Sequence, residues 1–117
     1  MEIKNIVDVL ASKPEGSFID IAQFNEHNFG VCSITGISPV WEMHPDTDEF
    51  FYIQEGEAVF VLLEASGEKE YRALAGSVFV VPKGIWHKPG APDGMKFLYF
   101  TPGESRHSEV RPECPSA

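Results

Sequence analysis

Two histidines and two glutamates stand at spacings that could bring their side chains to one point. Glu42 and His44 are two residues apart, and Glu49 follows shortly after them, in the stretch WEMHPDTDEF. Alternate residues of a β-strand face the same side, so Glu42 and His44 point together. His87 lies far downstream, in the stretch GSVFVVPKGIWHKP. Glu42, His44, Glu49 and His87 are therefore candidate ligands for one metal ion.

The residue types at these positions suit a divalent metal. Imidazole binds Zn, Cu, Fe and Ni well, whereas carboxylates bring in the harder Mn and Mg. Two histidines and one carboxylate also form the facial arrangement of non-haem Fe(II) oxygenases. Taken singly, however, a histidine is more often a hydrogen-bonded polar residue than a ligand, and a glutamate is more often solvated. The spacing alone therefore leaves a polar hairpin open as an alternative.

Two turns must position these residues. Residues 45–48, Pro-Asp-Thr-Asp, have the composition of a turn, and Glu49 then opens a strand on the same face as Phe51 and Ile53. If that strand pairs beside the first, the three polar side chains can converge. Pro82 and Gly84 flank the second turn and restrict the direction in which His87 leaves it.

The rest of the chain predicts a small all-β protein. Residues 3–11 place their apolar side chains on one helical face, and from there to residue 101 only short β-rich runs occur, separated by Gly, Pro, Asn and Asp. Such runs predict an antiparallel sandwich or barrel. They cover residues 17–24, 29–37, 40–44, 49–54, 57–64, 70–74, 77–82 and 95–101.

The expected organisation is an N-terminal segment (1–16), a barrel (17–101) and a polar C-terminal tail (102–117). The tail is expected to be loose, or to lie as an arm on a partner subunit. His27 and His107 fall outside the spacing pattern and are interpreted as surface residues. The predicted interior comprises Phe51, Ile53, Phe79, Val81, Phe97 and Tyr99, with Trp41, Met43 and Trp86 near the mouth or on the outer face.

Composition narrows the range of partners and locations. The 117 residues carry a formal net charge of −9, which argues against nucleic acid and anionic membranes as partners. No apolar run is long enough to span a bilayer, and the N-terminus does not resemble a signal peptide. Cys32 and Cys114 form no CxxC motif. We expect both to be free thiols in a cytoplasmic protein.

The two segments that hold the four candidate ligands resemble the cupin superfamily, in particular its small single-domain members. The family's first motif, G-x5-H-x-H-x3–4-E-x6-G, begins here at Gly36, with five residues between it and Glu42, which stands at the position of the first histidine. The remainder is matched from His44 through Glu49 to Gly56. The second, G-x5-P-x-G-x2-H-x3-N, is matched from Gly76 to His87. Its final Asn is replaced by Ala91.

The resemblance implies a double-stranded β-helix, a jelly-roll barrel that often forms a homodimer. It also implies that Glu42, His44, Glu49 and His87 bind a divalent metal, such as Fe(II), Mn(II), Zn(II) or Ni(II). Pairing His44 with Asp46 as the first two ligands is a poorer match. Only two residues would then separate Asp46 from Glu49, and the spacing to Gly36 would be lost.

Glu42 decides between two interpretations of the site. A carboxylate can replace imidazole as a ligand, and two carboxylates with two imidazoles favour hard ions such as Mn(II) or Fe(II). If the metal had been lost, two carboxylates in one cavity would repel, and at least one pKa should be raised. We expect either a metal-dependent enzyme acting on a small organic molecule by dioxygenase, isomerase or lyase chemistry, or a non-catalytic small-molecule-binding or sensing protein. A purely structural role has no specific feature in its favour.

Overall fold

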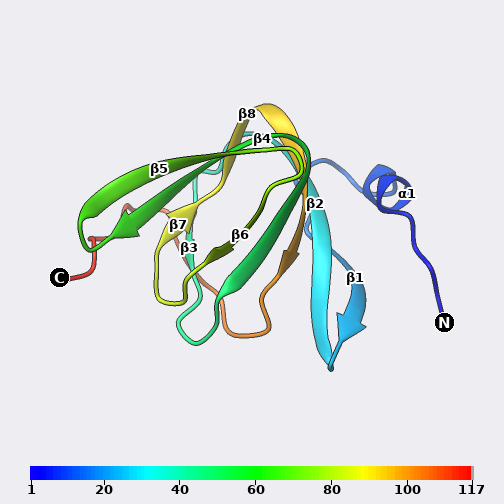
Figure 1. The fold of residues 1–117 in the computed structure, drawn as a ribbon, viewed down its shortest axis with the longest axis horizontal. Helices are drawn as coiled ribbons and strands as arrows, with labels where there is room; N and C mark the ends of the chain where they lie inside the picture. The colour runs from blue at the N-terminus through cyan, green and yellow to red at the C-terminus, as the bar shows by residue number, and fades with distance from the viewer. Residues whose placement is uncertain (117) are drawn as a thin grey trace.

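Nine strands and one short helix occur in residues 1–116, the part of the chain that the computed structural model describes (Figure 1). The strands pair antiparallel throughout and curl into a barrel. The elements are α1 (Ile6–Ala11), β1 (Ile19–Phe24), β2 (His27–Ile37), β3 (Trp41–Met43), β4 (Glu49–Glu64), β5 (Gly67–Leu74), β6 (Val78–Val81), β7 (His87–Lys88), β8 (Gly90–Phe100) and β9 (Arg106–Ser108). The predicted all-β barrel with a short N-terminal helix is confirmed.

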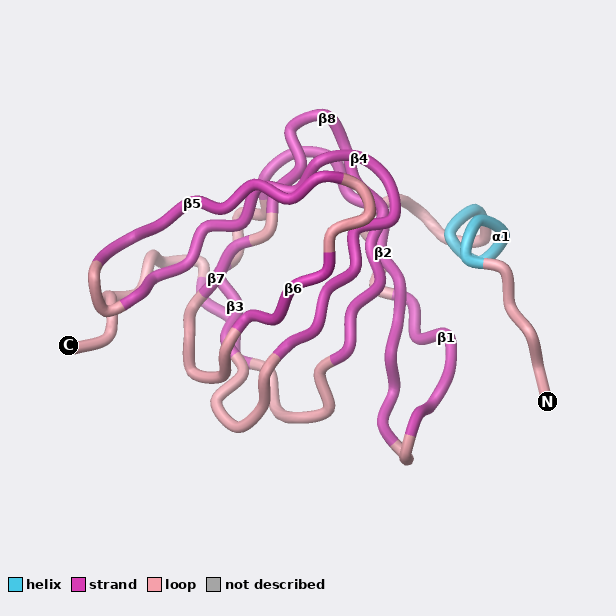
Figure 2. The backbone as a smooth tube through the Cα atoms, viewed as in Figure 1, coloured by secondary structure: helices cyan, strands magenta, loops and turns pink. Residues whose placement is uncertain are grey.

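The helix α1 is shorter than the predicted range of 3–11. It begins after Asn5, whose side-chain oxygen accepts hydrogen bonds from the backbone N–H groups of Val7 and Asp8 at 2.9 and 3.3 Å. An asparagine cap of this kind satisfies N–H groups that have no partner in the first turn. In the described chain no residue of α1 is buried, and the helix lies beside the barrel (Figure 2). No helix of residues 1–116 is long and apolar enough to cross a membrane.

Strand β4 links the two halves of the barrel. The sequence predicts two strands here, broken at residues 55–56, but one strand continues through both. Its first half pairs with β6 and β8, and its second half pairs with β5 and β7. The register with β8 shifts between Ile53 and Glu55, and Gly56 adopts φ 84°. A bulge with a left-handed glycine bends a strand without ending it, so the predicted break is a bend.

The barrel interior is apolar and largely aromatic. Of the predicted interior residues, Phe51, Ile53, Val81 and Phe97 are buried, and Phe79 and Tyr99 pack against them. Trp41, placed near the mouth or the outer face from the sequence, is buried too. Phe51 stacks on Phe79 at 5.3 Å between ring centroids and also reaches the edge of the His87 ring at 6.4 Å. The aromatic core therefore forms a wall of the candidate site.

The C-terminal segment departs from expectation. Its residues 106–108 form β9, which pairs with β3 of the same chain, so this part of the segment is not loose. Further on, the Arg111 guanidinium donates to Glu68 on β5 at 3.0 Å. The segment therefore lies along the barrel at the edge that carries Glu42. Both cysteines are free, as predicted, and burial raises the pKa of the Cys32 thiol to about 12.

Candidate metal centre

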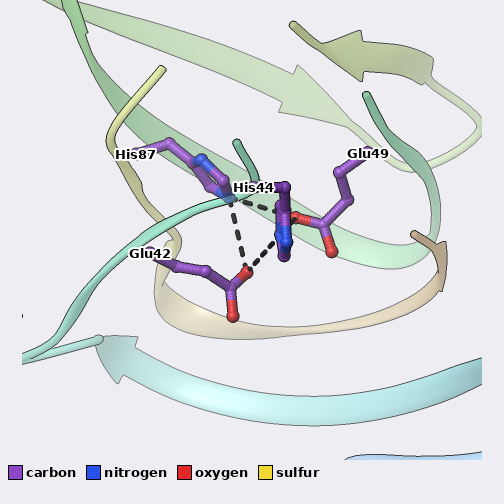
Figure 3. Close-up of side chains that lie close together, drawn as sticks. All are labelled: Glu42, His44, Glu49 and His87. Carbon is purple, nitrogen blue, oxygen red and sulfur yellow. Dashed lines mark hydrogen bonds and ion pairs between the residues drawn. The ribbon is translucent and has the colours of Figure 1, made fainter. Parts of the chain in front are cut away.

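The structure brings all four candidate residues together (Figure 3). Glu42 lies in β3, His44 follows the end of that strand, Glu49 begins β4, and His87 begins β7. Each offers one ligand atom, and these atoms lie within 4.8 Å of one another. The side chains of His44, Glu49 and His87 are 2, 4 and 1% exposed, whereas that of Glu42 is 25% exposed. Three of the four members are therefore buried, and the cluster reaches solvent beside Glu42.

One oxygen from each carboxylate faces the two imidazoles. Glu49 Oε1 lies 3.1 Å from His44 Nε2 and 3.0 Å from His87 Nε2. Glu42 Oε1 lies 3.2 Å from His44 Nε2 and 3.5 Å from His87 Nε2. Donor atoms bound at about 2.1 Å from one ion lie roughly 3 Å apart in adjacent positions. The observed spacings therefore suit a small divalent ion at the centre of the four atoms.

Backbone groups outside the cluster orient both imidazoles. His87 Nδ1 lies 3.0 Å from the Ile85 carbonyl oxygen. His44 Nδ1 lies 3.2 Å from the Glu104 carbonyl oxygen and 3.0 Å from the Ser105 hydroxyl. Because Nδ1–H donates to a carbonyl in each case, the neutral ring has its free lone pair on Nε2, which faces the cluster. Metal-binding histidines characteristically have such partners, so the residues present fit a metal ion.

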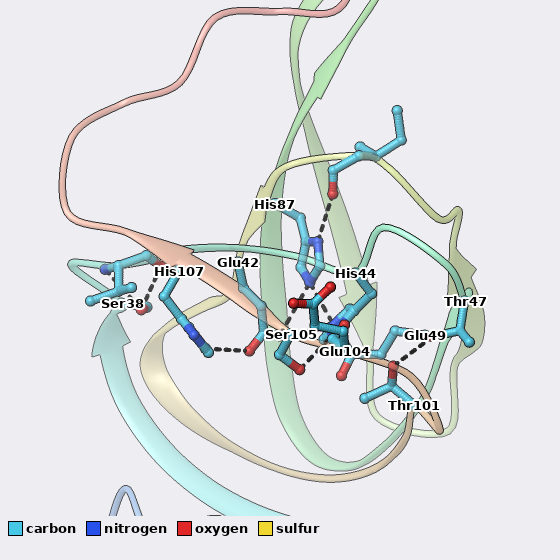
Figure 4. A network of polar contacts seen from close by, with 12 residues as sticks. Ser38, Glu42, His44, Thr47, Glu49, His87, Thr101, Glu104, Ser105 and His107 are labelled. Atoms are coloured by element: carbon cyan, nitrogen blue, oxygen red, sulfur yellow. Dashed lines mark hydrogen bonds and ion pairs between the residues drawn. The ribbon is translucent and has the colours of Figure 1, made fainter.

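Strand register places Glu42 between two histidines. Strand β3 lies between β7 and β9, and Glu42 is directly opposite His87 on one side and His107 on the other. Directly opposed residues of antiparallel strands have their side chains on the same face. Glu42 Oε2, the oxygen turned away from the cluster, lies 3.0 Å from His107 Nε2 (Figure 4). His107 was interpreted as a surface residue and is indeed exposed, but it contacts the site.

The sequence motifs therefore miss His107, Ser105 and Glu104. These residues lie in the polar C-terminal segment, and neither their types nor their spacing distinguish them from other tail residues. Ser105 and His107 are two residues apart, as same-face strand residues are. That pattern is too short to predict a strand, however. Only the pairing of β9 with β3 shows their proximity to the site.

The electrostatics of the metal-free cluster depend on opposite charges held close together. Burial by itself would lower the pKa of both histidines, but hydrogen bonds to Glu42 and Glu49 outweigh it and raise the pKa of His44 to about 10 and that of His87 to about 9. For Glu42, burial favours a higher pKa, but hydrogen bonds from His44 and His87 hold the pKa well below its usual value. The raised carboxyl pKa expected for a metal-free site is thus wrong for Glu42, because two imidazoliums neutralise the carboxylates. Within residues 1–116, every buried side-chain nitrogen and oxygen has a hydrogen-bond partner.

These shifts predict how the stability of the metal-free protein depends on pH. The folded state holds the histidine protons more tightly than the unfolded chain, so their contribution is complete below pH 6.5 and is lost as the pH rises towards 9 and 10. Glu42 has the opposite sign, because its contribution is present above pH 4.5 and is lost as the pH falls below it. We expect urea unfolding in the presence of a chelator to show the highest free energy of unfolding between about pH 4.5 and 6.5. A free energy that instead climbs from pH 7 to 9 would contradict charged histidines in the folded state.

A cavity of about 460 Å³ lies in the same barrel, partly open to solvent. Its walls include Leu62 on β4, which is paired opposite His87, and Val81 on β6, which is paired opposite Glu49. Phe60 and Phe79 also line the cavity. This volume lies within the range of small-molecule sites. An apolar hollow therefore lies next to the strands that carry the candidate ligands.

Known proteins share this fold and parts of this sequence. A family model of the cupin domain matches residues 34–107. The uncharacterized protein YdbB of Bacillus subtilis strain 168 is 34% identical over 77 residues, which are 65% of this chain and 64% of YdbB. The chain thus spans less than two thirds of the length of this curated relative.

Two solved structures illustrate the structural likeness. A cupin-2 domain containing protein from Shewanella frigidimarina NCIMB 400 is 30% identical, with a TM-score of 0.75 over 86% of this chain and 94% of that one. Hydroquinone 1,2-dioxygenase PnpCD, in complex with Cd²⁺ and 4-hydroxybenzonitrile, is 17% identical, with a TM-score of 0.71 over 86% of this chain and 72% of that one. The second likeness is one of fold alone. With the family match covering both motifs and the chain as far as His107 in β9, the chain belongs to the cupin domain family.

Proposed function

We propose that Glu42, His44, Glu49 and His87 bind one divalent metal ion and that the protein acts on a small organic molecule at this ion. The observation that carries the proposal is the convergence of four ligand atoms within 4.8 Å, with both imidazole Nε2 atoms turned inwards. The complex of the hydroquinone dioxygenase with Cd²⁺ and 4-hydroxybenzonitrile is consistent with such a role. A purely structural polar cluster does not require this orientation of both rings.

The four candidate ligands limit which metal ions can bind, but they do not determine the reaction. Two carboxylate oxygens balance the charge of a 2+ ion and suit Fe(II) or Mn(II), while two imidazoles also suit Zn(II) and Ni(II). A bound ion of this kind polarises an oxygen atom of a substrate as a Lewis acid. Glu42, at the exposed side of the cluster, is the ligand past which a substrate would reach the ion. The aromatic wall at Phe51 excludes water from the opposite side.

Metal content and turnover test the proposal separately. We expect protein prepared without metal to take up one equivalent of Fe(II), Mn(II), Zn(II) or Ni(II) by calorimetry and elemental analysis. Absence of stoichiometric binding of every one of these ions would refute the metal site. Oxygen uptake by the Fe(II) form on a panel of small phenols, keto acids and diols then tests dioxygenase chemistry, while product analysis without oxygen tests isomerase and lyase chemistry.

A non-catalytic ligand-binding protein is the second candidate. It is favoured by the carboxylate of Glu42 at the position of a family histidine, because two carboxylates weaken the Lewis acidity of the ion. The two candidates differ in turnover. Saturable binding of a small molecule without conversion under any of the tested conditions would favour the second.

Substitution of Glu42 by histidine tests whether this position contacts the metal. We expect E42H to bind Zn(II) or Ni(II) about tenfold more tightly, or about 1.4 kcal/mol, because imidazole is the softer ligand. Competition with a chromogenic chelator measures the change, and E55H, at an exposed surface position, is the matched control. Equal affinities of E42H and the wild-type protein would show that residue 42 does not bind the ion.

A homodimer and a cytoplasmic location are also proposed. Exposed apolar side chains support self-association, since Leu74, Val78 and Val80 are 64, 59 and 52% exposed. All three lie on β5, on β6 or at their ends. Light scattering with size-exclusion chromatography measures the mass in solution.

A further inference from the structure

The carboxylate of Glu42 has its two oxygens in different surroundings. Oε1 faces the imidazoles of His44 and His87 at 3.2 and 3.5 Å, whereas Oε2 lies 3.0 Å from His107 Nε2 (Figure 4). Glu42 is the most exposed member of the cluster, and a glutamate with solvent at one side can rotate away from a site. A hydrogen bond to Oε2 removes that freedom and leaves Oε1 pointing at the site.

Backbone pairing, rather than chance contact, brings His107 to this position. Strand β9 pairs with β3 so that Trp41 is opposite Ser108, Glu42 opposite His107, and Met43 opposite Arg106. His107 and Glu42 therefore share a face of the barrel. The His107 side chain is 57% exposed, so it contributes little to the core.

The chain leading into β9 is attached to the same site. The Glu104 N–H donates to Asp46 Oδ1 at 3.2 Å, and the hydroxyls of Thr47 and Thr101 lie 3.3 Å apart. The Glu104 carbonyl and the Ser105 hydroxyl contact His44 Nδ1. Residues 101–108 thus touch the 44–48 turn and two of the candidate ligand residues.

We propose that His107 is a positioning residue that holds Glu42 as a one-oxygen metal ligand. The inference rests on the proposed metal site and extends it to the C-terminal segment. By keeping Oε2 engaged, His107 prevents Glu42 from binding with both oxygens, which leaves more of the coordination sphere of the ion for a substrate. It also offsets the loss of the usual histidine at position 42 by fixing the carboxylate that replaces it.

Three single variants test the hydrogen bond. We expect H107A to lower Zn(II) and Mn(II) affinity about 10- to 100-fold, which is the loss typically seen when a residue that hydrogen-bonds to a metal ligand is removed. H107Q, whose amide N–H can donate to Oε2, should restore most of the affinity, which a general structural defect would not allow. H27A, at an exposed histidine on β2, is the matched control and should bind like the wild type. Circular dichroism and thermal melts with a chelator check that each variant is folded.

A double variant separates this inference from the metal site itself. If His107 acts through Glu42, adding H107A to E42A should lower affinity no further than E42A alone. Metal affinity of H107A equal to wild type, a loss in H107A that H107Q does not restore, or additive losses in the double variant would overturn the role of His107 and leave the metal site standing. A wild-type protein that binds none of the metals would overturn both.

Discussion

Replacement of His87 by alanine is expected to abolish stoichiometric metal binding and to destabilise the metal-free protein by about 3 kcal/mol or more. The side chain is 1% exposed and lies 3.0 and 3.5 Å from two carboxylate oxygens. Removing one partner from a buried charge cluster leaves the others uncompensated, which typically costs 3–5 kcal/mol. His87 follows a turn in the sequence, a position that predicts little effect on the fold. Its burial in β7 reverses that expectation.

Two measurements check this result. Calorimetric titration with Zn(II) or Mn(II) should show no binding at protein concentrations at which the wild type is saturated. Urea unfolding with a chelator at pH 6, where both histidines are charged, should show the loss of stability. H27A should match the wild type in both. Retention of one tightly bound equivalent of metal by H87A would exclude His87 as a ligand.

Glu49→Gln is expected to lower metal affinity by more than about 100-fold. This exceeds the loss typical of substitutions at residues that contact a metal ligand but not the metal itself. Glu49 Oε1 lies within 3.1 Å of both imidazoles, and its side chain is 4% exposed, so no solvent can compensate for the lost charge. Glutamine keeps the shape but presents a neutral amide. The metal-free protein should also lose stability, because two charge-assisted hydrogen bonds disappear.

The control for this substitution is E55Q. Glu55 is an exposed glutamate on the same strand, where it pairs with Lys96 at the surface at 3.1 Å. Exposed ion pairs of this kind contribute little to stability. We therefore expect E55Q to change neither the metal affinity nor the free energy of unfolding appreciably. Metal affinity of E49Q within a few-fold of wild type would mean that the ion, if bound, lies elsewhere. The same set of titrations with E42A ranks the two carboxylates, and we expect the more buried Glu49 to matter more.

Local signals predicted three members of the candidate site as neighbours, and the resemblance to the cupin superfamily added the fourth, His87. Two-residue alternation orients Glu42 and His44 together, and a four-residue turn returns the chain at Glu49. A proline and a glycine precede His87. The structure confirms that these four side chains meet. Their binding of a metal stays a prediction.

The fold was also predictable in class but less so in detail. Gly56 indicates a strand break by composition, yet its left-handed φ of 84° produces a bend within one long strand. Strand β8 begins at Gly90 rather than at residue 95, because residues 90–91 pair with β2. Glycine-rich sequence favours turns, and pairing with a neighbouring strand overrides that preference.

The sequence by itself determined the all-β class and the positions of the two turns, because each depends on neighbours a few residues apart. The convergence of His87 with the other three residues was implied by the resemblance to the cupin superfamily, since His87 lies 38 residues beyond Glu49. Only the tertiary structure decided the surroundings of these residues. His107 reaches the site through an edge strand of three residues, whose register against β3 is set by contacts more than 60 residues away in the chain, and Ser105 directly precedes that strand. The charges of the cluster were likewise not predictable from the sequence. Two carboxylates alone would repel, and the approach of His44 and His87 to 3.2 and 3.5 Å is what keeps Glu42 ionised.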